Sequence, residues 1–384
     1  MRGRRRAWAL GLVLGAGLWG CDAQYVVGAA GLIELPGPRL DAAPIAVALG
    51  DLDGDGALDG AVLLATQQLC VLRGQDDGSL APGVCVPLAE PTAALAVTEL
   101  AAPAQTAILV AGHLLAAYTT RPELTPTGAV RYPLTGGATA LLPAYVKCDG
   151  AKELGGCRRD VLVSDGTAGE VAVFFADTDA DGGGLRGPQR FPVDPGPVAL
   201  LFTDLDGDGA AELVTANRGA VPLTVLSQRG VATFSGCGDG RAQPLVRRPS
   251  AVAALALEDA DSRVLIVADA DDASLRLLRV ASLVPLALDC GAATRLAVAP
   301  DPLALATADF DGDGHDDLLI AHGSPPGLSL LLWAAGGLQA PRFFPVGAAV
   351  RGLALGDLDR DGRPDVVVAS SGDSTVRVLR SAFR

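Results

Sequence analysis

The chain is poor in aromatic residues, histidine and charge, and each shortage removes a class of function. Aromatic residues make up 4% of the 384 residues, charged residues 19%, and only three histidines occur. No Cys-x-x-C, His-Glu-x-x-His or Gly-x-Ser-x-Gly motif is present, so zinc, redox and common hydrolase sites have no support. No basic patch with interleaved aromatics appears, which argues against nucleic acid as a partner.

Glycine, proline and small apolar residues are abundant instead. The chain has 48 Gly and 26 Pro, and 49% of its residues are hydrophobic. Runs of Ala, Val and Leu are interrupted every few residues by Gly, Pro or Asp. This texture favours many short strands joined by turns over helices.

One phrase recurs along the chain: an apolar strand, an acidic loop and a second apolar strand. Four clear copies occupy residues 45–65, 198–216, 303–321 and 350–369. Three weaker copies, at 94–111, 138–163 and 254–268, have lost most acids, replaced the loop or shortened it. The seven repeats start near residues 44, 92, 138, 196, 250, 301 and 348, at spacings of roughly 46 to 58 residues.

Two further apolar segments follow each pair, which gives four short antiparallel strands per repeat, the unit of a propeller blade. The sequence therefore predicts an all-β, seven-bladed β-propeller over residues 31–384. The last repeat ends after its third strand, whereas Leu32-Ile33-Glu34-Leu35-Pro36 resembles a fourth strand. We expect this N-terminal strand to complete the last blade and close the ring, which hides sheet edges. The alternative is that residues 22–40 form a flexible tether.

The acidic loops, numbered 1 to 4 along the chain, have the form D-x-D-x-D-G-x-x-[DE]. Acids at positions 1, 3, 5 and 9 are the ligand candidates: Asp51, Asp53, Asp55 and Asp59; Asp204, Asp206, Asp208 and Glu212; Asp309, Asp311, Asp313 and Asp317; Asp357, Asp359, Asp361 and Asp365. The backbone carbonyl at position 7 is a further candidate, in Ala57, Ala210, His315 and Arg363.

Calcium is the cation that this pattern predicts, at about four sites. Calcium takes six to eight oxygen ligands, and Gly at position 6 permits the sharp turn. Position 12, which is Glu in an EF-hand, is Val62, Thr215, Ile320 or Val368, and the flanks are strands. The alternative of solvated acidic turns without metal leaves several converging carboxylates to repel each other.

Two other acidic stretches resemble these loops. Asp177, Asp179 and Asp181 have suitable spacing but lie between third and fourth strands, where a hairpin turn is expected, as for 76–78. Residues 258–261 stand in the right place, but the shortened loop lacks calcium geometry.

The N-terminus has the features of an export signal. Four arginines within residues 2–6 precede a short apolar stretch, which is too short to span a bilayer comfortably. Leu18-Trp19-Gly20-Cys21 resembles the lipobox of bacterial lipoproteins, in which the cysteine is lipidated. We expect a signal peptide over 1–20, a tether over 21–30 and a chain lipid-anchored at Cys21 on a bacterial envelope. Secretion with Cys21 free and an uncleaved anchor are the alternatives.

Cysteine usage agrees with export. Removing Cys21 from the seven cysteines leaves six, an even number suited to an oxidising compartment. Proximity suggests three pairs among the 15 possible sets: Cys70–Cys85, Cys148–Cys157 and Cys237–Cys290.

The repeats resemble the FG-GAP/VCBS repeats of integrin-α-type β-propellers, over nearly all of the mature chain. In that family the calcium loop joins the first two strands of a blade, as it would here. No clear Phe-Gly pair occurs in each repeat, so the VCBS-like branch fits better. No inserted domain or metal-dependent adhesion site is visible, so integrin-like ligand binding is not implied.

The sequence thus favours a calcium-stabilised, non-enzymatic binding or scaffold protein whose partner is a protein or a glycan. A lectin is the first alternative, but Trp333 is the only tryptophan beyond the signal segment, and sugar sites usually stack on aromatics. A propeller lyase or hydrolase is the second, but the clustered acids are assigned to metal.

Overall fold

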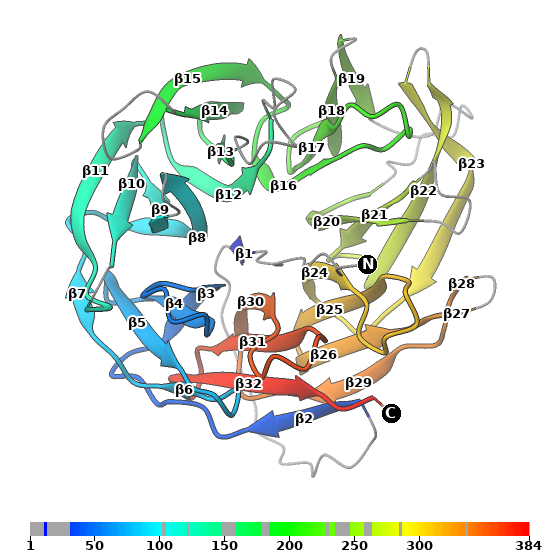
Figure 1. The fold of residues 1–384 in the computed structure, drawn as a ribbon. Coiled ribbons are helices and arrows are strands. Elements are labelled where there is room, and N and C mark those ends of the chain that lie inside the picture. The colour runs from blue at the N-terminus through cyan, green and yellow to red at the C-terminus, as the bar shows by residue number, and fades with distance from the viewer. Residues whose placement is uncertain are drawn as a thin grey trace, which may run out of the picture.

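The structure, a computed structural model, describes residues 11–13, 31–101, 105–120, 123–146, 158–177, 184–227, 230–234, 246–256, 263–283, 286–334 and 337–383. Its strands form a small two-stranded sheet and seven larger sheets arranged around a ring, and each larger sheet contains four antiparallel strands of one blade. The seven-bladed all-β propeller expected from the repeats is confirmed (Figure 1). The described residues contain no helix, and so none that could cross a membrane.

Blades 1 to 4 follow one another along the chain. Blade 1 is β3 (Pro44–Gly50), β4 (Asp59–Leu64), β5 (Gln68–Gly74) and, paired with β5, β6 (Leu80–Ala81) and β7 (Cys85–Pro87). Blade 2 is β8 (Thr92–Ala101), β9 (Gln105–Gly112), β10 (Leu114–Thr119) and β11 (Thr127–Pro133). Blade 3 is β12 (Ala138–Ala144), β13 (Asp160–Asp165), β14 (Glu170–Ala176) and β15 (Leu185–Pro192), and blade 4 is β16 (Pro197–Thr203), β17 (Glu212–Asn217), β18 (Leu223–Ser227) and β19 (Gly230–Phe234).

Blades 5 to 7 complete the ring. Blade 5 is β20 (Pro249–Ala256), β21 (Arg263–Asp269), β22 (Ser274–Leu283) and β23 (Leu286–Ala297). Blade 6 is β24 (Pro302–Ala308), β25 (Asp317–Gly323), β26 (Pro326–Leu331) and β29 (Arg342–Pro345), with a small hairpin of β27 (Trp333–Ala334) and β28 (Gly337–Leu338). Blade 7 is β30 (Val350–Gly356), β31 (Asp365–Ser370), β32 (Thr375–Ser381) and β2 (Leu32–Leu35).

The ring is closed by the N-terminal strand, as expected. β2 pairs antiparallel with β32, so that Leu32 lies opposite Ser381 and Leu35 opposite Val378. Leu32 is buried in the core shared by blades 6 and 7. Glu34 forms an ion pair with Arg377 of β32. The outermost strand of the last blade is thus supplied by the start of the propeller.

A further short strand, β1 (Gly11–Val13), pairs antiparallel with β30 at the inner edge of blade 7. It lies near the centre of the ring (Figure 1). These residues belong to the predicted signal peptide. The predicted lipidation site Cys21 and tether lie outside the described residues.

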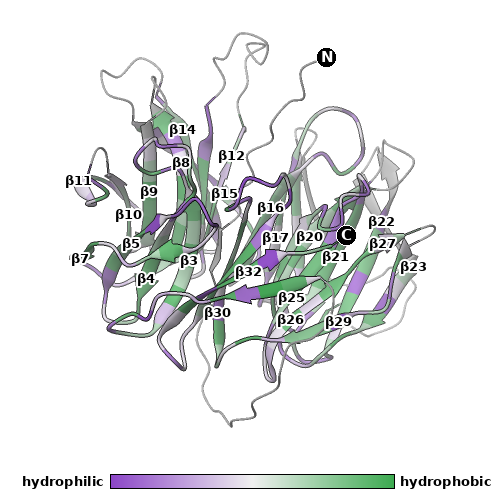
Figure 2. Cartoon of the chain, turned by 60° about the horizontal axis from the view of Figure 1, so that its bottom comes forward, coloured by the Kyte–Doolittle hydropathy of each residue, from purple (hydrophilic) through white to green (hydrophobic). Residues whose placement is uncertain are grey.

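Burial falls from the second strand of a blade to its outer strand. Every residue of β4, β13, β17 and β31 is buried, because these strands carry neighbouring blades on both faces. Residues of the outer strand β11 are exposed or half-buried. In Figure 2 the strands are largely hydrophobic and most connecting loops are hydrophilic. Continuous apolar second strands therefore specify the interior of the ring.

The hydrophobic core is divided into clusters that join neighbouring blades. One cluster packs Leu162 and Val173 of blade 3 against Leu200 and Leu213 of blade 4. Others join blade 7 to blade 1, blade 4 to blade 5, blade 5 to blade 6 and blade 6 to blade 7. The ring is thus held by blade-to-blade contacts between small aliphatic side chains, as in other repeat architectures.

Candidate metal sites on the propeller rim

Each acidic loop joins the first strand of its blade to the second. Loop 1 connects β3 to β4, loop 2 connects β16 to β17, loop 3 connects β24 to β25, and loop 4 connects β30 to β31. Because the corresponding strands of every blade run in the same sense around the ring, the four loops lie on one rim. They belong to blades 1, 4, 6 and 7.

The loop is shaped by the aspartate at position 1. In loop 1, Asp51 accepts hydrogen bonds from Gly54 N (2.5 Å) and Gly56 N (3.2 Å). Both glycines have φ of +87°, a conformation that side-chain-bearing residues rarely adopt. Asp204 and Asp309 make the same two bonds in loops 2 and 3. The turn therefore points the carboxylates inward before any metal is considered.

Three carboxylates converge in each loop, with one ligand oxygen from each lying within 4.8 Å of the other two. The groups are Asp51, Asp53 and Asp59; Asp204, Asp206 and Glu212; Asp309, Asp311 and Asp317; and Asp357, Asp359 and Asp361. Positions 1, 3 and 9 thus come together in loops 1 to 3, and positions 1, 3 and 5 in loop 4.

The remaining candidate acids lie outside these groups. At position 5, Asp55, Asp208 and Asp313 each accept a hydrogen bond from the backbone N–H of position 7, at 2.7 to 2.8 Å. That bond fixes the end of the turn. A metal-ligand role remains a prediction for the backbone carbonyls at position 7, which belong to Ala57, Ala210, His315 and Arg363.

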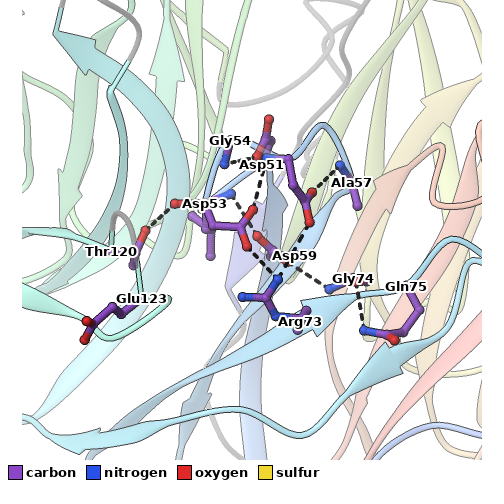
Figure 3. Close-up of polar contacts among 12 residues, drawn as sticks. Asp51, Asp53, Gly54, Ala57, Asp59, Arg73, Gly74, Gln75, Thr120 and Glu123 are labelled. Atoms are coloured by element: carbon purple, nitrogen blue, oxygen red, sulfur yellow. Dashed lines mark hydrogen bonds and ion pairs between the residues drawn. The ribbon is translucent and has the colours of Figure 1, made fainter.

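The acid at position 9 has a second role that the motif did not reveal. It is the first residue of the second strand, and we call it the strand-start acid. Asp59 is fully buried and accepts bonds from Leu52 N (3.0 Å) and Gly74 N (2.8 Å), at the end of β5. Figure 3 shows Asp59 between its loop and Gly74. Asp317 and Asp365 repeat this bridge, to Trp333 N and Ser381 N.

Blade 3 keeps the strand-start acid. Asp160 is buried at the start of β13 and accepts bonds from Val146 N (3.1 Å) and Ala176 N (2.8 Å). Its partners match those of Asp59 in position. Asp160 was not predicted from the sequence because it stands at the end of a cysteine-bearing segment. The signal that could have found it is the acid that begins β4, β17, β25 and β31 alike.

Burial raises the pKa of the strand-start acids of the four acidic loops, and the neighbouring loop carboxylates raise it further. The pKa is about 6 for Asp59 and Asp317 and about 7 for Glu212 and Asp365. Backbone hydrogen bonds oppose the shift without cancelling it. A cation among the carboxylates would remove this electrostatic cost and favour the ionised form.

The chemistry of the sites fits calcium. All side-chain donors in the four groups are carboxylate oxygens, which suit a hard cation and not a soft metal. In loop 4, where Arg360 replaces the position 4 glycine, Asp357 Oδ1 is buried and has no hydrogen-bond partner. A buried acceptor oxygen without a donor is rare in proteins, and a bound cation would satisfy it.

Calcium binding is therefore expected to release protons near pH 6. The pKa values of these acids are higher in the folded chain than in the unfolded chain, so the unfolded chain loses its protons first as the pH rises. Without metal, the free energy of unfolding therefore declines as the pH rises from about 4 to about 7. At pH 6, adding saturating calcium should release roughly two to three protons per chain, and at pH 8 almost none. Titration in weak buffer with a pH electrode would measure this. Equal release at both pH values would contradict it.

The loops also hold neighbouring blades together through the apolar residue at position 2. Leu52, Leu205, Phe310 and Leu358 are all buried, and each belongs to the cluster shared with the next blade. The carbonyl of Leu52 accepts a bond of 2.6 Å from Thr120 Oγ1 in blade 2 (Figure 3). A change in the shape of an acidic loop is thus transmitted to the blade interface.

The other sequence predictions have mixed outcomes. The pairing of Cys70 with Cys85 is confirmed as a cross-strand disulfide between β5 and β7. Cys148, Cys157 and Cys237 lie outside the described residues, as does the side chain of Cys290. Residues 76–78 form a turn between β5 and β6, and Asp177 follows β14. Residues 178–183 and 257–262 are outside the described part.

Comparison with known families gives one match. Residues 294–368 match the family described as FG-GAP-like repeat. This segment contains the last strand residues of blade 5, all of blade 6, and β30 with the first part of β31 in blade 7, and therefore acidic loops 3 and 4. None of the curated proteins matches the chain.

Solved structures share the fold at low sequence identity. The crystal structure of BBS1N in complex with ARL6DN, soaked with lead, is 15% identical, with a TM-score of 0.64 over 93% of this chain and 98% of that one. The same complex soaked with mercury is 14% identical, with a TM-score of 0.63 over 92% of this chain and 97% of that one. A functionally unknown protein from Desulfotomaculum acetoxidans DSM 771 is 13% identical, with a TM-score of 0.48 over 83% and 88%. The first two show a propeller fold of the same extent.

Proposed function

We propose that this propeller, which carries an FG-GAP-like repeat, is a calcium-stabilised, non-enzymatic binding scaffold of a bacterial cell envelope. The observation that carries the proposal is the convergence of three carboxylates in each acidic loop, on loops whose position 2 side chains pack into the next blade. Calcium in these loops would neutralise the carboxylates and fix the blade interfaces. The ring would then present a rigid surface to a partner.

The acids that would hold calcium are the three-carboxylate groups of the four loops, together with the position 7 carbonyls. Calcium supplies charge neutralisation and shape, and no chemical step is assigned to it. Within the described residues, the groups with a strongly raised pKa all belong to the acidic loops. His322 is fully buried, burial lowers its pKa, and its Nε2 lies against Ser329 Oγ. These features support binding over catalysis.

A protein is the partner class that we favour over a glycan. BBS1N, which has the same fold over the same extent, was crystallised in complex with a second protein, ARL6DN. In this chain Trp333, the only tryptophan after the predicted signal peptide, is buried and so is not offered to a sugar ring. Attachment through a lipid on Cys21, after export, is the envelope location that we propose.

Affinity capture from detergent-solubilised envelope tests this function. The full chain is immobilised in 1 mM calcium and in chelator, with a soluble cell fraction as the control extract. A protein partner retained only from the envelope and only in calcium is the expected result. Retention of glycans without protein would favour a lectin, and no calcium-dependent retention at all would contradict the proposal.

A further inference from the structure

Two arginines reach into acidic loops 1 and 4 from the same position of their blades. Arg73 is the penultimate residue of β5, and its Nη1 lies 2.8 Å from Asp53 Oδ2 and 3.7 Å from Asp55 Oδ2. Figure 3 shows its guanidinium pointing at the carboxylate of Asp53. Arg380 is the penultimate residue of β32, and its Nη1 lies 3.3 Å from Asp359 Oδ2.

The two positions correspond residue by residue. Gly74, which follows Arg73, donates its N–H to the strand-start acid Asp59. Ser381, which follows Arg380, donates in the same way to Asp365. In loop 3 the corresponding donor is Trp333, so the residue in the arginine position is Leu332. Leucine carries no charge, so loop 3 lacks the cation that its blade could have supplied there.

The arginines pair with carboxylates that belong to the metal groups. Asp53 and Asp359 are the position 3 members of loops 1 and 4. Their side chains are 8% and 13% exposed, whereas those of Arg73 and Arg380 are 46% and 38% exposed. The carboxylates are therefore nearly buried, whereas each arginine side chain is partly exposed and can move away into solvent.

Arg360 lies near Gly56 of loop 1 and Arg363 near Gly312 of loop 3, but among the described contacts neither forms an ion pair with a loop carboxylate. The guanidinium of Arg363 is close to Gly312 in loop 3, but it donates to Phe383 O. Among the described residues, the loop 3 carboxylates accept hydrogen bonds only from backbone N–H groups of their own loop; these carboxylates are Asp309, Asp311 and Asp313. Within the described part of the chain, loop 3 thus has no ion pair comparable with that of Arg73.

We infer that Arg73 and Arg380 are built-in counter-cations that weaken calcium binding at loops 1 and 4. Each arginine neutralises a position 3 carboxylate in the metal-free loop and must release it when calcium arrives. The divalent ion and the guanidinium also repel each other across a few ångströms. The propeller therefore has a tight site in loop 3 and weaker sites in the adjoining blades 7 and 1, and it responds to calcium in steps. This inference rests on the proposed calcium binding.

The test uses full chains in which one loop is left intact. Asp204→Asn, Asp309→Asn and Asp357→Asn together leave loop 1, and calcium affinity is measured by chelator competition or calorimetry. Adding Arg73→Leu, which installs the residue of loop 3, should tighten the calcium Kd by roughly tenfold, the size expected for removing a unit charge near a divalent ion. Arg73→Lys, which keeps the charge, should stay within about threefold of the parent.

A second pair of measurements separates the role of the arginine from general disruption. Without calcium, Arg73→Leu should lower the Tm, because loop 1 loses its counter-cation. The matched variant Arg380→Leu should behave alike in a chain that keeps only loop 4. An Arg73→Leu Kd unchanged or weaker than the parent's would overturn the inference while leaving calcium binding standing. No calcium binding by the one-loop parent, whatever residue is at 73, would instead count against the proposed function.

Discussion

Replacing Asp160 by alanine is expected to lower the free energy of unfolding by about 2 to 5 kcal/mol, to the same extent in calcium and in chelator. Asp160 is buried and holds Val146 N and Ala176 N. Its removal leaves two half-buried N–H groups without acceptors at the strand ends of blade 3. The strand-start acid would thus be a structural group in its own right.

Denaturant unfolding of the full chain, with and without calcium, measures this effect. Asp76→Ala is a matched control, because that aspartate side chain is 97% exposed and should change stability by less than about 0.5 kcal/mol. The loss of stability caused by Asp160→Asn should lie between those of Asp160→Ala and Asp76→Ala, since an amide keeps one acceptor oxygen. A loss that appeared only in calcium would show instead that Asp160 acts through a metal.

Removing calcium from the wild-type chain is the second change with a large expected effect. For dissociation constants of about 10⁻⁴ to 10⁻³ M, as in extracellular modules, each site adds about 0.4 to 1.4 kcal/mol at 1 mM calcium. Four sites then add about 2 to 6 kcal/mol, which for a domain of this size corresponds to roughly 3 to 8 °C in Tm.

Removing calcium should increase protease sensitivity more at the acidic loops than in the core strands. The side chains at position 2 of the loops are buried, and a loop that lost its shape would expose them: Leu52, Leu205, Phe310 and Leu358. Limited proteolysis in chelator should therefore cut first at the acidic loops, whose tips are exposed. Cleavage in the described outer strands before the loops would contradict the idea that calcium braces the blade interfaces.

Much of the fold is readable in the sequence because a propeller repeats one local pattern. The first strands of blades 1 to 3 begin at Pro44, Thr92 and Ala138, where the apolar runs resume after turns. The closing strand β2 was visible because the last repeat lacks a fourth strand. Each inference needed only neighbouring residues and the rule that sheet edges are covered.

The double role of the strand-start acid was not predictable in the same way. Its donors come from loop position 2 and from the end of the third strand, such as Gly74 for Asp59 and Ser381 for Asp365. Those contacts exist only once three strands are in register. A motif that specifies ligand spacing contains no information on a partner some fifteen residues away.

The arginine contacts were hidden for a related reason. Arg73 and Arg380 stand in ordinary third strands, and their charge acquires meaning only from the register that sets them beside Asp53 and Asp359. In loop 4 the substitution of glycine by Arg360 was visible, but its consequence, the unpaired Asp357 Oδ1, was not. The spacing of acids in the sequence located the loops, whereas the differences between the loops became visible only in the structure.

Calcium in the four acidic loops is proposed to stabilise the ring. The most direct test compares Tm in 1 mM calcium and in chelator for the wild type and for a chain carrying Asp51→Asn, Asp204→Asn, Asp309→Asn and Asp357→Asn. We predict that calcium raises the Tm of the wild type by several degrees and leaves that of the variant unchanged. A wild-type Tm indifferent to calcium, or an equal rise in both chains, would contradict the claim.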